Sequence, residues 1–149
     1  YIICGLLVIF ILGILLSGHA KNVSLETVQQ NIASCESINT LKKGTARDMR
    51  KNLDLDESLF DWSIYYCGNG LMDVSELLIV KSDNSAALET AEKAAASRLD
   101  AQKTNFDGYG TNQIDLLGHA ITKKVGPYYF YAVSEHASTW EEVFMGLVK

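Results

Sequence analysis

The first twenty residues contain no lysine, arginine, aspartate or glutamate, so every charged side chain lies at or after Lys21. The 13 basic and 18 acidic residues that follow give a net charge of −5, and no block of basic residues is present. Nucleic-acid binding normally needs a cationic stripe, so the sequence argues against it and against docking on an anionic lipid surface. A chain of 149 residues is long enough for one compact domain.

The uncharged beginning of the chain is an apolar run from Tyr1 to Leu16. A membrane-spanning helix needs roughly 17–25 such residues, and because the chain starts with tyrosine rather than methionine we expect further residues upstream. Three interpretations fit this run. It is an uncleaved signal anchor, a signal peptide cut after Ala20 in the small-x-small pattern of residues 18–20, or a buried core helix.

We expect residues 1–20 to form a transmembrane signal anchor or signal peptide, with residues 1–17 in contact with the membrane. Residues 21–149 then form a single domain outside the cytoplasm of a single-pass protein, or a secreted domain if the chain is cleaved near Ala20. A lipoprotein signal needs a cysteine directly after the apolar run. Cys4 lies inside that run, so lipid attachment is not expected.

Cysteine is scarce, with three residues, of which Cys35 and Cys67 belong to the expected domain. In an exported domain this pair can form a disulfide. The alternative is two separate, half-buried thiols, because a sequence does not show whether two Cα atoms come within bonding range. Neither CxxC nor a Cys/His spacing is present, so no zinc site is predicted.

Sequence motifs of catalysis and cofactor binding are also missing. The chain contains no Walker loop, no GxGxxG and no GxSxG, so we expect no cofactor and no metal. The three histidines, His19, His119 and His136, are isolated from one another and from any Ser–His or Cys–His signature. The sequence therefore favours a protein that is not an enzyme.

The segment SRLDAQKTNFDGYG, residues 97–110, predicts the end of a helix and a glycine-punctuated loop. Residues 105–108 resemble the middle of an EF-hand, but that register places Lys103 and Ile114 at the first and twelfth ligand positions, which argues against calcium. A helix that stops at Gly108 is the simpler interpretation. Tyr109, an aromatic residue between two glycines, then either packs on the domain or contacts a ligand or partner.

Apolar periodicity predicts an α+β domain. Capping boxes at Thr45-x-x-Asp48 and Ser138-x-x-Glu141, together with i, i+3, i+4 apolar spacings, indicate helices. Alternation indicates strands around Gly68-Asn69-Gly70 and Gly126-Pro127. We expect two layers, with helices packed on a mostly antiparallel four-stranded sheet. The predicted helices cover residues 24–32, 45–53, 85–106, 112–117 and 138–147, and the predicted strands cover residues 62–67, 74–81, 119–125 and 128–134.

Glu76 and Arg98 are predicted to form an ion pair. Glu76 alternates in phase with apolar residues of its strand, so its side chain points to a buried face. The strand rises about 16 Å from Glu76 to Lys81, and the following helix descends about 20 Å from Ser85 to Arg98, which brings the two residues level. Such a pair either ties the helix to the sheet or forms an anion site through Arg98.

Residues 128–131 place aromatic side chains on both faces of one strand. One face is expected to join the core. The other, which includes Tyr128 or its neighbour, is expected to be exposed and to contact a partner.

Four pieces of sequence in this order resemble a known family: DVSELLIVK (73–81), the helix with SRLDAQKTNFDGYG, the strand with GPYYFYAVSE (126–135), and an amphipathic C-terminal helix. They resemble the domain of unknown function 4358 family, well over residues 55–149 and loosely over 21–54. The resemblance implies a bacterial domain that usually follows a lipoprotein signal or a membrane anchor, and it implies no established activity. This chain lacks the lipoprotein cysteine, which favours a protein anchor.

Two classes of function remain. The first hypothesis is a non-enzymatic, membrane-anchored binding module whose Tyr109 loop and last hairpin contact an envelope component, a partner protein or a small ligand. The second is an uncharacterised, hydrolase-like enzyme with a pocket near Glu76 and Arg98. A concave pocket with convergent polar groups would indicate an enzyme, and a flatter aromatic surface would indicate a binding module. A structural spacer domain is a third interpretation, and no sequence feature distinguishes it.

Overall fold

A computed structural model of the chain describes Gly5 and residues 19–149. Among these residues, no helix combines the length and the apolar character that crossing a membrane requires. The expected membrane segment, residues 1–17, falls outside the described residues except for Gly5. The signal-anchor, signal-peptide and core-helix interpretations therefore stay predictions.

The centre of the domain is an antiparallel sheet with the strand order β1-β2-β3-β5-β4. Its strands are β1 (Lys42–Lys43), β2 (Trp62–Cys67), β3 (Glu76–Lys81), β4 (Ile121–Val125) and β5 (Tyr128–Val133). The sheet has five strands, so the expectation of four was wrong. The additional strand, β1, consists of two exposed lysines paired with β2. Nothing in the sequence marks this strand, because two charged residues carry no apolar alternation.

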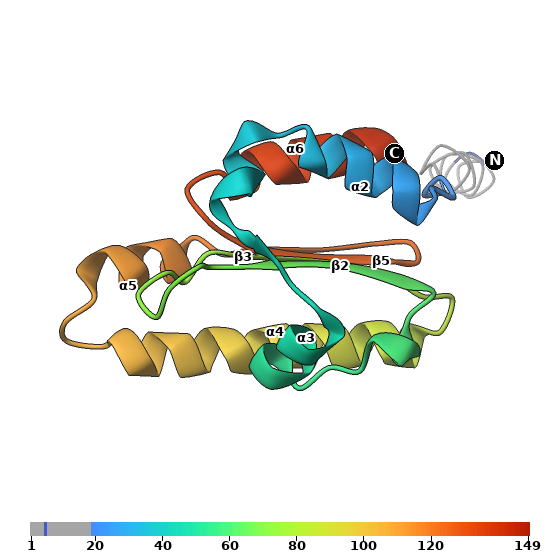
Figure 1. Cartoon of the computed structure of the whole chain (residues 1–149). Helices are drawn as coiled ribbons and strands as arrows, with labels where there is room; N and C mark the ends of the chain where they lie inside the picture. Colours follow the sequence, from blue (N-terminus) through green and yellow to red (C-terminus); the bar gives the residue numbers. More distant parts are fainter. Residues whose placement is uncertain (1–4, 6–18) are drawn as a thin grey trace.

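Helices cover both faces of this sheet (Figure 1). The described α-helices are α2 (Leu25–Ala33), α3 (Ala46–Leu53), α4 (Ser85–Phe106), α5 (Thr111–Gly118) and α6 (Ala137–Val148). Helices α2 and α6 lie on one face, α3 and α4 lie on the other, and α5 lies beside the end of α4. The α+β class is confirmed, but the domain has three layers where two were expected.

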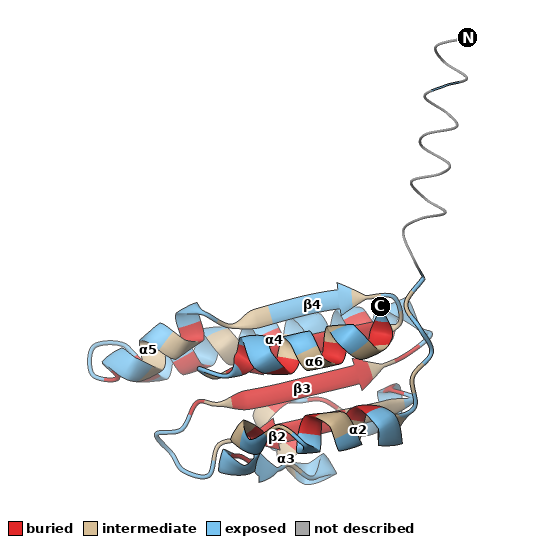
Figure 2. Cartoon of the chain, turned by 90° about the horizontal axis from the view of Figure 1, so that it is seen from above, coloured by how far each residue is buried: buried red, intermediate tan, exposed pale blue. Residues whose placement is uncertain are grey.

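The central strand explains the third layer. Leu77 and Ile79 of β3 belong to the core under α2 and α6, whereas Leu78 and Val80 belong to the core under α3 and α4. Figure 2 shows β3 buried and the edge strand β4 largely exposed. A strand that is apolar on both faces needs cover on both faces, which the sequence-based expectation of a two-layer domain did not take into account.

Strand β5 contributes aromatic side chains to both cores, and all of them are buried. Tyr128 and Phe130 pack under α2 and α6, and Tyr129 and Tyr131 pack on the opposite face. The expectation of an exposed aromatic face on the last hairpin was therefore wrong. Tyr128 has no exposed surface, and its hydroxyl donates to the Lys21 carbonyl at 2.8 Å, so it is a core residue and not a surface contact.

Both described cysteines are free thiols. Cys67 packs in the core on the α4 side of the sheet, and Cys35 packs against the core on the α2 and α6 side. The sheet separates the two sulfur atoms, so the alternative of a Cys35–Cys67 disulfide does not fit this fold.

Helix boundaries follow the capping residues, with one exception. The capping box at Thr45 and Asp48 opens α3 as predicted, and Asn84 caps α4. The predicted capping box at Ser138 was wrong, because α6 begins at Ala137 and its N-cap residue makes no side-chain cap. This helix depends on its buried apolar stripe rather than on capping.

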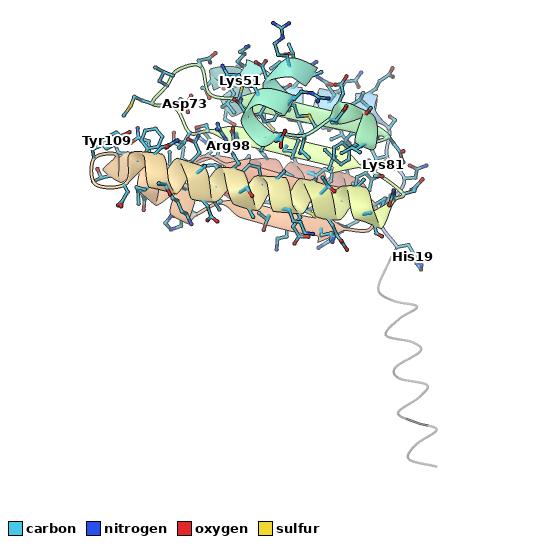
Figure 3. The ribbon with its side chains drawn as sticks, turned by 90° about the horizontal axis from the view of Figure 1, so that it is seen from below. His19, Lys51, Asp73, Lys81, Arg98 and Tyr109 are labelled. Atoms are coloured by element: carbon cyan, nitrogen blue, oxygen red, sulfur yellow. The ribbon has the colours of Figure 1, made fainter. Side chains whose placement is uncertain are left out.

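The described N-terminal residues lie at one end of the sheet. The Lys21 amide donates to the Val148 carbonyl at 2.7 Å, and a methyl group at Gly126 would lie 2.7 Å from Ala20 Cβ. Figure 3 shows His19 and Lys81 at this end, while Tyr109 lies at the other. The long helix α4 thus runs from the N-terminal end of the domain toward the end with Tyr109.

Candidate functional site

The most buried charged side chain of the described chain is Glu76, at the start of β3, with 2% of its surface exposed. Its Oε1 atom accepts hydrogen bonds from Arg98 Nε at 2.9 Å and lies 2.8 Å from Arg98 Nη2. Arg98 projects from the middle of α4, at the level that the strand and helix rises predict. An ion pair therefore ties α4 to the sheet, and the Arg98 side chain keeps 22% of its surface exposed.

Two tyrosines complete the bonding of Glu76. The Tyr65 hydroxyl donates to Oε1 at 2.9 Å, and the Tyr131 hydroxyl lies 3.4 Å from Oε2. Burial raises the pKa of both tyrosines well above the ordinary value of 10.0, and the charge of Glu76 adds to this. Both hydroxyls therefore stay protonated and remain donors. Asn52 of α3 donates to the Tyr65 oxygen at 3.1 Å, which extends the network to a second helix.

The charge of Arg98 is maintained by its partner. Burial alone would lower the pKa of Arg98, but the hydrogen bond and the negative charge of Glu76 outweigh it and hold that pKa above its ordinary value. The hydrogen bond from Nε and the ion-pair contact of Nη2 both involve the same oxygen of Glu76, and Nη1 makes no bond to another described residue. Arg98 therefore keeps donor capacity toward the solvent-facing side.

A cleft of about 620 Å³ lies over this ion pair, between α3, α4 and the connection from β2 to β3. We call it the Glu76 cleft. Its volume is within the range of roughly 300–1,000 Å³ that is usual for small-ligand sites. The residues that line it are Lys42, Asp48, Lys51, Asn52, Cys67, Gly68, Asn69, Gly70, Leu71, Asp73, Glu76, Arg98, Gln102, Asn105, Phe106 and Tyr109.

Helix α4 forms one wall of the Glu76 cleft with a polar stripe. Arg98, Gln102 and Asn105 follow one another at i, i+4 and i+7, so they share one face of the helix. Tyr109 stands just beyond the helix end with 66% of its surface exposed. The stripe thus begins at a buried charge and ends at an exposed aromatic ring.

Gln102 differs from its neighbours in being buried, with 8% of its surface exposed. Its side-chain amide makes no hydrogen bond to any described residue and is not among the fully buried polar atoms, so it is open to the cleft. An amide offers both donors and an acceptor. Gln102 is therefore placed to bond a group that enters the cleft.

Helix α3 forms the facing wall with Asp48, Lys51 and Asn52. Asp48 accepts from the Thr45 amide at 2.9 Å and pairs with Lys42 of β1 at 3.2 Å. The backbone and side-chain hydrogen bonds of Thr45, followed by those of Lys42, hold the pKa of Asp48 below its ordinary value. Asp48 is therefore occupied as a helix cap.

The connection of β2 and β3 forms the rim of the cleft. It covers residues 68–75 and is longer than the Gly-Asn-Gly turn that the sequence predicted. Leu71 is 98% exposed at its tip, beside the half-exposed Met72. The Gln113 side chain of α5 donates to the Met72 carbonyl at 3.0 Å and links this rim to the loop that carries Tyr109.

The histidines lie outside the Glu76 cleft. His119 and His136 line smaller pockets near the start of α6, with Ser134 and Glu135. Among residues 19–149, no hydrogen bond joins a histidine ring to a serine or cysteine side chain. No cluster of three metal-ligating side chains occurs in the part of the chain that the structure describes.

A family model for a domain of unknown function, DUF4358, matches residues 34–134, which is more than half of the chain. The chain belongs to the DUF4358 family. No curated protein and no solved structure matches it. The DUF4358 match contains every residue that lines the Glu76 cleft, whereas α2 lies before it and α6 lies after it. The portion that defines the family thus includes the whole cleft.

Three of the four binding residues predicted from the sequence lie together in the structure, and one does not. Glu76, Arg98 and Tyr109 all line the cleft of this DUF4358 domain, and Tyr128 lies in the core on the opposite face of the sheet. Gln102 and Asn105 were missed. Their spacing from Arg98 was a usable signal, because residues four and seven positions along a helix share its face.

Proposed function

We propose that this DUF4358 domain is a non-enzymatic binding module, anchored at the membrane and located outside the cytoplasm, that binds an envelope component in the Glu76 cleft. The observation that carries the proposal is Gln102, a side chain that is 8% exposed and whose amide is open to the cleft without a partner among the described residues. An amide in this position can bond a ligand that enters the cleft through both its oxygen and its amino group.

By the criterion drawn from the sequence, the shape of the cleft favours the hydrolase-like alternative, because the cleft is concave and lined by convergent polar groups. The bonding of Glu76 favours binding. Its Oε1 atom accepts hydrogen bonds from Arg98 and Tyr65, and its Oε2 atom faces Tyr131. A general base needs an oxygen within hydrogen-bond reach of the substrate proton, and both oxygens of Glu76 are already directed at protein groups.

The position of the cleft supports binding at a distance from the membrane. His19 lies at one end of the domain, and Tyr109, which lines the cleft, lies at the other end (Figure 3). With residues 1–17 in the membrane, the Tyr109 rim faces away from the bilayer and toward other envelope components.

The experiment is photo-crosslinking of the full-length protein in cells. A photoreactive residue replaces Tyr109 at the rim, and a matched control carries it at the exposed Glu142 of α6. We expect a specific adduct from position 109 that is absent from position 142, identified by mass spectrometry. Equal adducts from both positions, or none from position 109 while position 142 reacts, would reject the cleft as a binding site.

A further inference from the structure

We propose that the ligand of the Glu76 cleft is a neutral oligosaccharide, held by the amide stripe of α4 and stacked on Tyr109. This inference rests on the proposed function and names the chemistry of its ligand. Its first support is the balance of charge in the cleft, where three basic and three acidic side chains meet. Two of these pairs, Arg98 with Glu76 and Lys42 with Asp48, are already closed as ion pairs.

A charged ligand would gain little from such a lining. Outside the two ion pairs, the charged lining residues are Lys51 on the α3 wall and Asp73 on the rim. Their charges are opposite, so the lining has no net charge. A neutral ligand meets no electrostatic penalty here. The uncharged donors and acceptors of the walls then decide what binds.

Amide side chains dominate these uncharged groups. Asn52, Asn69, Gln102 and Asn105 all line the cleft, and two of them make side-chain hydrogen bonds within the protein. Gln102 presents a carbonyl oxygen and an amino group side by side, which matches two adjacent hydroxyl groups of a sugar ring, one as donor and one as acceptor. Most of the residue is packed, with 8% of its surface exposed, while the amide itself is open to the cleft.

Tyr109 supplies the apolar contact that a sugar ring needs. Its ring lies 5.7 Å from that of Phe106, centroid to centroid, and Phe106 is buried, so one side of Tyr109 is supported. Its exposed surface remains open at the end of the amide stripe. The C–H bonds on one face of a sugar pack well on an aromatic ring whose hydroxyl stays in water.

The test is calorimetric titration of the full-length protein in detergent with three probes. These are oligomers of N-acetylglucosamine, maltose oligomers and, as the charged comparison, oligomers of galacturonate. We expect one of the two neutral probes to bind. Which of them binds shows whether the ligand is an amino-sugar polymer or a glucan. Binding should change less than about twofold between about 0.05 and 0.5 M salt, because no net charge is neutralised.

Variants locate the site. Gln102→Leu keeps the approximate size of the side chain and should weaken binding about tenfold, the effect of losing one hydrogen bond to the ligand. Lys103→Ala, on the exposed side of the same turn, should leave affinity unchanged. Tyr109→Ala should weaken binding about tenfold, whereas Tyr109→Phe should retain it, because only the ring stacks.

Failure of this inference is distinguishable from failure of the proposed function. If neither neutral oligosaccharide binds, or if galacturonate binds more tightly with a steep salt dependence, the neutral-sugar assignment is overturned. A protein adduct at position 109 in the crosslinking experiment would then keep the binding module and replace its ligand. Absence of both an adduct and saccharide binding would reject both proposals.

Discussion

Glu76 connects four elements of the fold through one carboxylate. Its partners come from β2, α4 and β5, while it belongs to β3 itself. A carboxylate that is 2% exposed is stable only while its charge is compensated and its oxygen atoms are hydrogen-bonded. The tyrosines supply part of this bonding, and Arg98 supplies the charge.

Removing Arg98 alone should therefore lower the free energy of unfolding more than removing the charges of Arg98 and Glu76 together. Arg98→Leu leaves a buried carboxylate without a countercharge and is expected to lower the free energy of unfolding by about 3–5 kcal/mol. The double variant Glu76→Gln/Arg98→Leu should lose less, because no charge remains buried and the amide oxygen still accepts from the tyrosines. Urea unfolding at neutral pH measures both.

The exposed pair of Lys124 and Glu92, at 3.3 Å, provides the control. Lys124→Leu should change the free energy of unfolding by less than about 1 kcal/mol, because exposed ion pairs contribute little. A double variant that is less stable than Arg98→Leu would contradict the role given to Glu76.

Asp48 makes the stability of the α3 wall depend on pH. Its folded-state pKa lies below the ordinary value of 3.8, with the hydrogen bonds of Thr45 as the main cause. A lowered folded pKa stabilises the fold above the unfolded pKa, and this contribution is lost as pH falls through the folded pKa. Asp48→Asn should therefore be less stable than the parent at neutral pH, with a difference that shrinks below pH 3.8. Thermal unfolding from pH 7 to pH 2 tests this; a difference that persists in acid would contradict it.

At the scale of elements, α3 and α4 were predictable and β1 was not. Capping residues and apolar stripes fix where these helices start and which side faces the sheet. Strand β1 forms where residues 42–43 pair with the edge of β2, and this tertiary contact leaves no pattern in two lysines. The β2–β3 connection was predicted as a tight turn for a similar reason. Its extra residues bond outside the hairpin, as Asn69 does when it donates to the Thr40 carbonyl at 2.7 Å.

The same connection contains a matched pair of glycines. A methyl group at Gly68 would lie within 2.5–2.7 Å of Asp73, including its backbone oxygen, whereas a methyl group at Gly70 would meet nothing within 4 Å. Gly68→Ala should therefore displace the rim and lower the free energy of unfolding by about 1–3 kcal/mol. Gly70→Ala should change it by less than about 0.5 kcal/mol. Equal effects in denaturant titrations would show that the rim accommodates side chains at both positions.

At the scale of the whole molecule, the site was half predictable. The rise per residue of a strand and of a helix places Glu76 and Arg98 at the same height, so their pairing could be predicted from the sequence. The facing wall of α3 did not follow, because its packing beside α4 depends on the sheet having two covered faces. For the same reason the sequence suggested an exposed aromatic hairpin, where the second helical layer buries it.

The three-layer fold also sets the direction in which the cleft faces. The Ser82 amide donates to the Pro127 carbonyl at 2.9 Å, next to Gly126 and Ala20, so α4 starts at the N-terminal end. Its 22 residues then extend about 33 Å toward Tyr109. If residues 1–17 anchor the protein, a position at the start of α4 lies near the bilayer and Tyr109 lies far from it.

Fluorescence quenching in proteoliposomes measures this difference. A fluorescent amino acid is placed at the exposed Asp83 or at Tyr109 of the full-length protein, and the quencher is attached to lipid headgroups. We expect strong quenching at position 83 and little at position 109, because quenching fades over distances far shorter than the length of α4. A soluble quencher should affect both positions and serves as the control. Stronger headgroup quenching at position 109 would mean that the cleft faces the membrane, which would contradict both the orientation and the choice of an envelope ligand.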